Sequence, residues 1–219
     1  MTNLYGKNHR ELQDNFDSRK MADRLENLIV KKELDDSACE FIESLDMFFI
    51  STIDHNGRPT VSYKGGDTGF IKVVDKNTIA FPSYDGNGMF MSLGNIKENN
   101  KVGLLFISFE KPHRLRVHGE ASISDKDPLM KKYKEADLIV RIKISDYWQN
   151  CPRYIHKYTK MKKSKYVPRK GSNTPIAGWK KTDAVNDVLS KKDKRKINKK
   201  DIIGISEWMI KVKNGDSSA

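Results

Sequence analysis

Apolar and polar positions divide the chain into a helical beginning, a middle of short strands and a less regular end. Between residues 10 and 32, apolar side chains recur at spacings of three to five, which predicts an amphipathic helix. Asp35-Asp36-Ser37 supplies capping residues for a second helix that reaches Leu45. Because such stripes are usually packing surfaces, we expect both helices to cover the core or a partner subunit.

The pattern changes to short apolar runs separated by turn residues after Asp46. These runs predict strands at 47–53, 60–64, 70–74 and 78–81. Asn56-Gly57 is a favoured hairpin corner, and Asp75-Lys76-Asn77 is a second turn. Five or six short strands with tight turns indicate a small antiparallel barrel.

The stretch 78–123 is the most informative part of the chain. A strand runs into a polar, glycine-rich loop at 83–88, and a helix-like turn follows at 89–96. Two long strands come next: residues 101–109 are apolar on both faces, and residues 114–123 alternate apolar with polar. N–H groups of the loop and the helix start are free to point at a phosphate, so this stretch is a candidate anion site. An ordinary connecting loop is the competing interpretation.

Regularity weakens in the last third of the sequence. A short helix is expected at 128–133, a long strand at 138–147, a helix at 183–190 and an amphipathic helix within 202–212. We therefore predict three parts: N-terminal helices at 1–45, the barrel at 46–160 and a basic extension at 161–219.

Charge is distributed unevenly along the 219 residues, whose formal net charge is +12. From Lys160 onwards there are 17 Lys and Arg against 6 Asp and Glu, whereas the first 159 residues hold 24 against 23. The cluster 191–200 is suited to nucleic acid or an anionic membrane. A solvated helix face is the favoured interpretation, and no nucleic-acid motif is present, so a nucleic-acid partner is not expected.

Location and redox state follow from what the sequence lacks. No apolar run is long enough to span a membrane, and the first residues have no apolar signal-peptide core, so we expect a cytoplasmic protein with no membrane association. Cys39 and Cys151 are far apart and are expected to be free thiols.

Several chemistries are not supported by the sequence. The five histidines show no metal-ligand spacing, so no metal is expected. Walker, Gly-x-Gly-x-x-Gly and Gly-x-Ser-x-Gly patterns are absent, and no nucleophile is identifiable. No catalytic residue is assigned.

Three segments in order carry a family resemblance: Ser62–Asp67, the stretch 78–123 and Asn150–His156. Together they resemble the pyridoxamine 5′-phosphate oxidase-like flavoproteins, in particular an uncharacterised FMN-binding branch, over roughly residues 11–179. The resemblance implies an antiparallel split β-barrel of the flavin-reductase type with flanking helices. It also implies a homodimer with FMN at the interface, contacted by both chains.

The resemblance implies two groups of FMN contacts. For the phosphate, the candidates are Tyr84, Asn87, Met89, Ser92 and Asn95, helped by Lys64 or Arg116. Related sequences often carry a basic residue where this chain has Gly88, so a charge partner is missing there.

The second group lies along the flavin ring. The candidates are Ser62, Lys64, Gly65, Gly66 and Lys72; Gly65-Gly66 taken alone would be only a β-bulge. Arg153 is a candidate to reach the flavin of the partner subunit, with a structural role for Pro152 and Tyr154 as the equal alternative.

Function is left as a choice between classes. The favoured hypothesis is an FMN-dependent oxidoreductase acting on an unknown small molecule. The alternatives are a non-catalytic protein that holds flavin, haem or a deazaflavin, and a nucleic-acid-associated protein that uses its basic tail. True pyridoxamine phosphate oxidase activity is not expected, because no match to that enzyme's substrate-phosphate arginine and histidine is found near the C-terminus.

Overall fold

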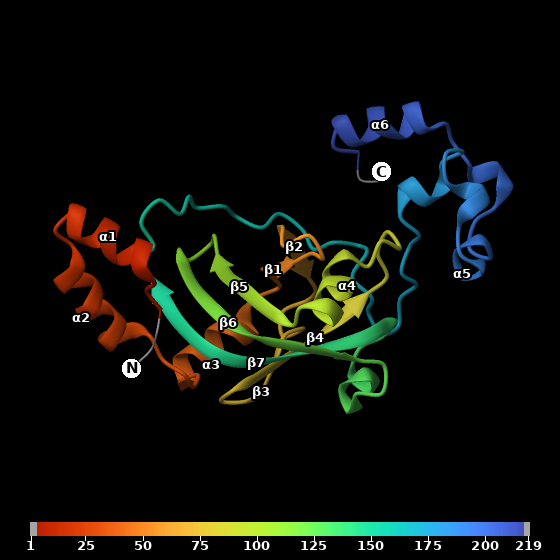
Figure 1. Ribbon diagram of the computed structural model, residues 1–219. Helices are drawn as coiled ribbons and strands as arrows, with labels where there is room; N and C mark the ends of the chain where they lie inside the picture. Colours follow the sequence, from red (N-terminus) through yellow and green to blue (C-terminus); the bar gives the residue numbers. More distant parts are fainter. Residues whose placement is uncertain (1–3, 217–219) are drawn as a thin grey trace. The chain divides into compact units, whose positions relative to one another are not determined.

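The computed structural model describes residues 4–216, which divide into two compact units between Lys163 and Ser164. The first unit contains one seven-stranded antiparallel sheet in the order β2-β1-β5-β6-β7-β4-β3 (Figure 1). Its strands are β1 (Met47–Ile53), β2 (Pro59–Gly65), β3 (Lys72–Asp75), β4 (Thr78–Tyr84), β5 (Lys101–Ser108), β6 (His113–Ser124) and β7 (Ala136–Asn150).

Helices flank this sheet within the first unit. They are α1 (Lys7–Asn15), α2 (Arg19–Ile29), α3 (Asp36–Ser44), α4 (Met91–Glu98) and the 3-10 helix η1 (Pro128–Lys132). The expected antiparallel split barrel with flanking helices is confirmed by this strand order and by the helices around it.

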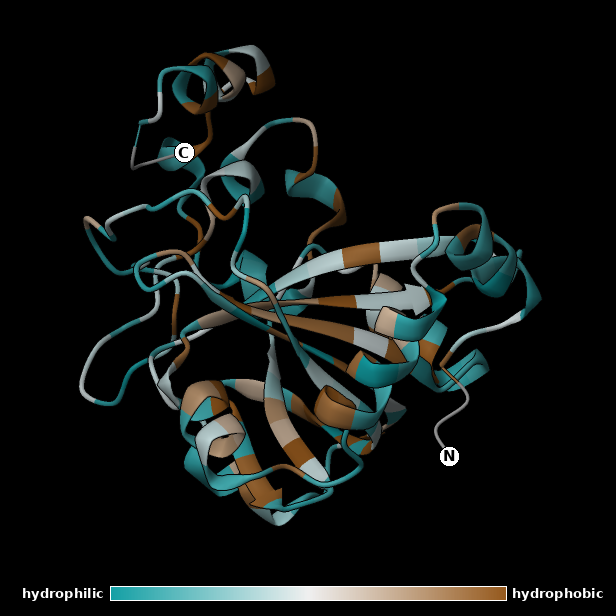
Figure 2. Ribbon diagram, turned by 90° about the vertical axis from the view of Figure 1, so that its left-hand side faces the viewer, coloured by the Kyte–Doolittle hydropathy of each residue, from teal (hydrophilic) through white to brown (hydrophobic). Residues whose placement is uncertain are grey.

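Alternation along the strands explains where the core lies. β1 buries Phe48 and Ile50, β5 buries Val102, Leu104 and Phe106, and Figure 2 shows hydrophobic segments alternating with polar ones along the strands. The helices α3 and α4 add apolar side chains to the same cluster. Burial of each large apolar side chain contributes about 1.5–3 kcal/mol of free energy, and this burial stabilises the curled sheet.

The opposite face of β1, β2, β5 and β6 is only partly covered within one chain. On the edge strand β2, Val61 is 70% exposed and Tyr63 is 61% exposed. The expectation that β5 is covered on both faces is therefore only partly correct, because Leu105 remains half-buried.

Local differences from the sequence prediction have local causes. The stripe at 10–32 forms two helices rather than one, because the chain turns at Asp17, which has φ +50°, and neither α1 nor α2 buries a residue. The second predicted helix is confirmed: Asp35 caps α3 by accepting a hydrogen bond from the Ala38 N–H. β4 extends to Tyr84, so Ser83 and Tyr84 are strand residues rather than loop residues.

The second unit is built from short helices. They are η2 (Gly178–Lys181), η3 (Asn186–Val188), α5 (Lys191–Lys194), η4 (Lys199–Asp201) and α6 (Ile205–Lys213). The predicted helix at 183–190 is wrong, since only one 3-10 turn forms there. The predicted amphipathic helix near the end is α6.

Candidate functional site

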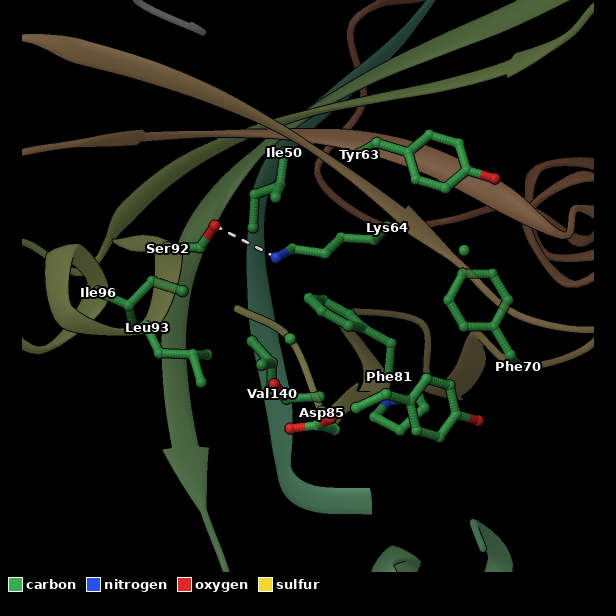
Figure 3. Close-up of a pocket in the computed structure, with 15 residues that line it drawn as sticks. Ile50, Tyr63, Lys64, Phe70, Phe81, Asp85, Ser92, Leu93, Ile96 and Val140 are labelled. Carbon is green, nitrogen blue, oxygen red and sulfur yellow. Dashed lines mark hydrogen bonds between the residues drawn. The ribbon is translucent and has the colours of Figure 1, made fainter. Parts of the chain in front are cut away.

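A cavity opens where the two sides of the curled sheet approach each other. Strands β1 and β2 form one wall, β4 and β7 form the other, and the first turns of α4 close one side; the volume is about 260 Å³. Phe81, Phe70 and Ile50 supply much of its apolar surface (Figure 3). β2 and β3 are the two edges of the sheet, so the barrel remains split beside the cavity.

Lys64 is the cation of this cavity. Its register partner in β1 is the fully buried Phe48, so its side chain points to the inner face of the sheet. Its Nζ donates a hydrogen bond to Ser92 Oγ at 3.2 Å, and Ser92 Oγ donates to Ser62 Oγ at 2.9 Å (Figure 3). Burial lowers the pKa of Lys64 below its usual value, and no ion pair joins it to a carboxylate within residues 4–216.

The start of α4 provides further donors beside Lys64. Phe90 precedes the helix in the left-handed region, with φ +51°, and it offers no side-chain cap. The first N–H groups of a helix have no partner within the helix, and Ser92 and Leu93 line the cavity. A lysine, two hydroxyls and a helix N-terminus therefore meet at one place, which suits a phosphate group.

Tyr84 lies on the far side of the cavity, at the end of β4. Burial, followed by the charge of Asp67, raises the pKa of Tyr84 to about 12. Its hydroxyl consequently keeps its proton at neutral pH and is available as a hydrogen-bond donor.

The structure brings together five of the residues expected from the sequence. Lys64, Gly65, Tyr84 and Ser92 line the cavity, and Ser62 is hydrogen-bonded to Ser92. Packing also explains why glycine occupies positions 65 and 66, since a Cβ at Gly66 would lie 2.4 Å from the Phe70 ring. The space beside Gly66 is therefore filled by Phe70.

Other candidates lie outside the cavity. Lys72 is on β3, with Nζ 3.9 Å from Glu43 Oε1. Asn95 is buried and donates hydrogen bonds to the hydroxyls of Thr52 and Thr60. Asn87 and Met89 are exposed, and the Asn87 side chain accepts a hydrogen bond from the Met89 N–H.

The two candidate arginines lie away from the cavity of their own chain, one on the outer face of the sheet and the other in the segment after β7. Arg116 faces outward on β6, opposite Leu105 and Trp148. Arg153 is exposed in the segment after β7, where its guanidinium lies 5.9 Å from the Tyr154 ring. Neither is among the residues that line the cavity of the same chain.

The missing charge at Gly88 has a conformational explanation. Gly88 has φ +78°, a region that only glycine adopts readily, so the turn before α4 requires glycine at this position. The apolar lining residues Ile50 and Phe81 were not proposed from the sequence, although the alternation of β1 contained the signal for Ile50.

Metal binding and membrane spanning find no support in the described chain. Residues 4–216 contain no group of three or more His, Cys, Asp and Glu placed to hold a metal ion. No helix in this range is both long and apolar enough to cross a bilayer.

Comparisons with solved structures give weak similarities. HupZ of Group A Streptococcus is 14% identical, with a TM-score of 0.44 over 57% of this chain and 99% of its own. An FMN-binding protein from Syntrophomonas wolfei is 13% identical, with a TM-score of 0.42 over 64% and 97%. The heme storage protein HutZ from Vibrio cholerae is 17% identical, with a TM-score of 0.38 over 51% and 90%.

The family assignment rests on sequence. No curated protein matches the chain significantly. The family model described as pyridoxamine 5′-phosphate oxidase matches residues 34–162, which include every strand and the whole lining of the cavity. The chain therefore belongs to the pyridoxamine 5′-phosphate oxidase family.

Proposed function

We propose that the protein binds FMN in this cavity and is a flavin-dependent oxidoreductase acting on a small molecule. The observation that carries the proposal is the convergence of Lys64, Ser62, Ser92 and the α4 N-terminus beside an apolar cavity. This arrangement suits a ligand with a phosphate at one end and a flat apolar body at the other.

The protein's own groups have definable roles in this proposal. Lys64 and the hydroxyls of Ser62 and Ser92 hold the phosphate, and the aromatic walls exclude water from the ring. Tyr84 donates a hydrogen bond to the ligand. Bound flavin supplies hydride or electron transfer, which no side chain here can perform.

Haem is the less suitable occupant of the cavity. The lining includes Tyr84 but no His, Cys or Met, the more frequent axial ligands of haem iron. A flavin needs no axial ligand, so the lining favours flavin over haem.

We further propose a homodimer in the cytoplasm. The support is the apolar surface left open on one chain: Val61 on β2, and Tyr154 and Met161 in the segment after β7, which are 88% and 96% exposed. In this dimer, Arg153 of the partner subunit is the candidate to reach the proposed ligand, as the resemblance implies.

The first test is an absorbance spectrum of the purified protein, followed by heat release and mass analysis of any chromophore. We expect flavin bands and released FMN, or uptake of added FMN by colourless protein. Lys64→Met should weaken FMN binding by about 10- to 100-fold, because a charge-assisted hydrogen bond contributes about 1.5–3 kcal/mol.

The matched control is Lys72→Met, which removes a lysine outside the cavity and should leave FMN affinity within about twofold of wild type. A colourless protein that also fails to bind added FMN would refute the proposal. Binding without reduction by any nicotinamide nucleotide or other donor would leave a flavin-binding protein that is not an enzyme.

A further inference from the structure

The C-terminal unit presents a basic cluster, defined here as residues 191–200, that lies outside the range matched by the family model. Seven of its ten residues are Lys or Arg, and all seven are exposed. They are distributed over α5, the turn that follows it and η4. The sequence alone favoured a solvated helix face, and the structure adds three observations that change this interpretation.

The first observation concerns Asp193, the one acidic residue inside the basic cluster. Its Oδ2 lies 3.1 Å from Nζ of Lys180, and the two side chains are only 13% and 5% exposed. Ser190 also donates a hydrogen bond to Asp193 Oδ2, at 3.0 Å. The carboxylate is therefore turned inward and neutralises a buried lysine rather than the surface cations.

The second observation is that the cluster is held by a folded framework. Ile203 N–H donates to Lys181 O at 3.0 Å, and Asp183 N–H donates to Ile203 O at 3.0 Å. Asp183 Oδ1 accepts a hydrogen bond from Ile205 N–H at 2.9 Å, so this acidic side chain is also engaged within the unit. The basic residues are consequently presented on a fixed backbone.

The third observation is that repulsion among the cations is not compensated. Lys191 and Arg195 are four residues apart, at the start of α5 and at its C-cap, a spacing at which like charges repel on a helix. Within residues 4–216, no ion pair involves the five cations Lys191, Arg195, Lys196, Lys199 and Lys200. A bound polyanion would relieve this repulsion.

We propose that the basic cluster binds nucleic acid through its phosphate backbone, without reading the bases. Eight of its ten residues lie in helices or turns. At about 1.5–2 Å per residue the cluster extends over roughly 15–20 Å, the length of about five phosphates along one strand. The cluster contains one apolar residue, Ile197, which is half-buried. The cluster could therefore attract anionic headgroups, but it has no apolar face to insert into a bilayer. These features favour nucleic acid over an anionic membrane.

The proposal is tested with the full-length protein and a fluorescent duplex DNA of arbitrary sequence, by anisotropy between 50 and 200 mM salt. Neutralising about five phosphates predicts a slope of about −4.5 in log affinity against log salt. The affinity should therefore fall by two to three orders of magnitude, on the order of 500-fold, across that range.

The cluster variant replaces the five unpaired cations by glutamine: K191Q, R195Q, K196Q, K199Q and K200Q. The matched control replaces five exposed lysines of the first unit and has the same net charge: K7Q, K20Q, K97Q, K101Q and K126Q. We expect the cluster variant to lose at least 100-fold in affinity at 50 mM salt and most of the salt slope. The control should stay within about threefold of wild type.

Three results would overturn the proposal. One is no duplex binding by the wild type at 50 mM salt, a measurement that requires no variant. Another is an equal loss in both variants, which would show an effect of net charge alone. The third is binding to vesicles with anionic headgroups but not to duplex DNA, which would assign the cluster to a membrane surface.

Discussion

The burial and the lowered pKa of Lys64 follow from the way side chains alternate between the two faces of β2. Thr60, Ser62 and Lys64 share the inner face of β2, and Val61 and Tyr63 share the outer face. This register places an amine among apolar side chains, and burial lowers its pKa. A strand slipped by one residue would send Lys64 to solvent and bring Tyr63 inside.

The pH dependence of ligand binding follows from this lowered pKa. Phosphate needs the protonated amine, so FMN affinity should fall as pH rises from neutrality through the lowered pKa of Lys64, below its usual 10.5. The FMN phosphate is already a dianion above about pH 7 and contributes no opposing change. Equilibrium titration of the protein with FMN across this range measures the effect.

Riboflavin, which lacks the phosphate, is the control ligand for this prediction. Its affinity should vary little over the same pH range. Without ligand the sign for folding is opposite: the unfolded chain binds more protons at Lys64 between the two pKa values, so stability improves as pH rises through them. Parallel pH profiles for FMN and riboflavin would contradict the assigned role of Lys64.

At the scale of elements, the pairing of β6 with β7 contains an irregularity beside Gly119. The register shifts between His118 and Gly119, and a Cβ at Gly119 would lie 2.5 Å from the Lys143 carbonyl oxygen. A backbone atom cannot move aside as a flexible side chain can. Glycine at this position therefore permits the close strand approach.

Gly119→Ala should lower the free energy of unfolding by about 1–3 kcal/mol, because the added methyl meets backbone. Urea denaturation monitored by circular dichroism measures the change. Gly94→Ala is the matched control: it lies within α4 with nothing inside 4 Å of the new Cβ, so it should raise stability by about 0.5–1 kcal/mol. Equal effects of the two substitutions would exclude the close-approach explanation.

At the scale of the whole molecule, the cavity and the basic cluster lie in different units of the chain. The cavity belongs to the unit 1–163, whereas the basic cluster belongs to the unit 164–219. In a single chain, the edge strand β2 of the first unit exposes apolar side chains. Exposed apolar edges of this kind favour association with another chain.

Val61→Glu should therefore shift a dimer towards monomer, with at least a tenfold rise in the dimer dissociation constant, since the charge would be buried at the interface. Sedimentation velocity measures this against the 25.2 kDa chain mass. Val74→Glu, on the other edge strand β3, is the control and should not change the assembly. A wild-type monomer would refute the proposed dimer.

The sequence by itself determined the strands and most of their boundaries, because burial alternates with period two and turns need particular residues. It also identified Ser62, Lys64, Tyr84 and Ser92 as candidates, although it distributed them among separate roles. Asn95 and Lys72 could not be distinguished from them, because a polar residue carries no mark in sequence of whether its partner is a ligand or a neighbouring side chain.

Only the tertiary structure decided which candidates meet. Sheet curvature brings β2, β4 and α4 around one cavity, and residues 28–30 positions apart in sequence become hydrogen-bonded neighbours there. The pairing of Asp193 with the buried Lys180 likewise depends on folding of the second unit. Local pattern determines which way a side chain faces, but long-range packing determines what it faces.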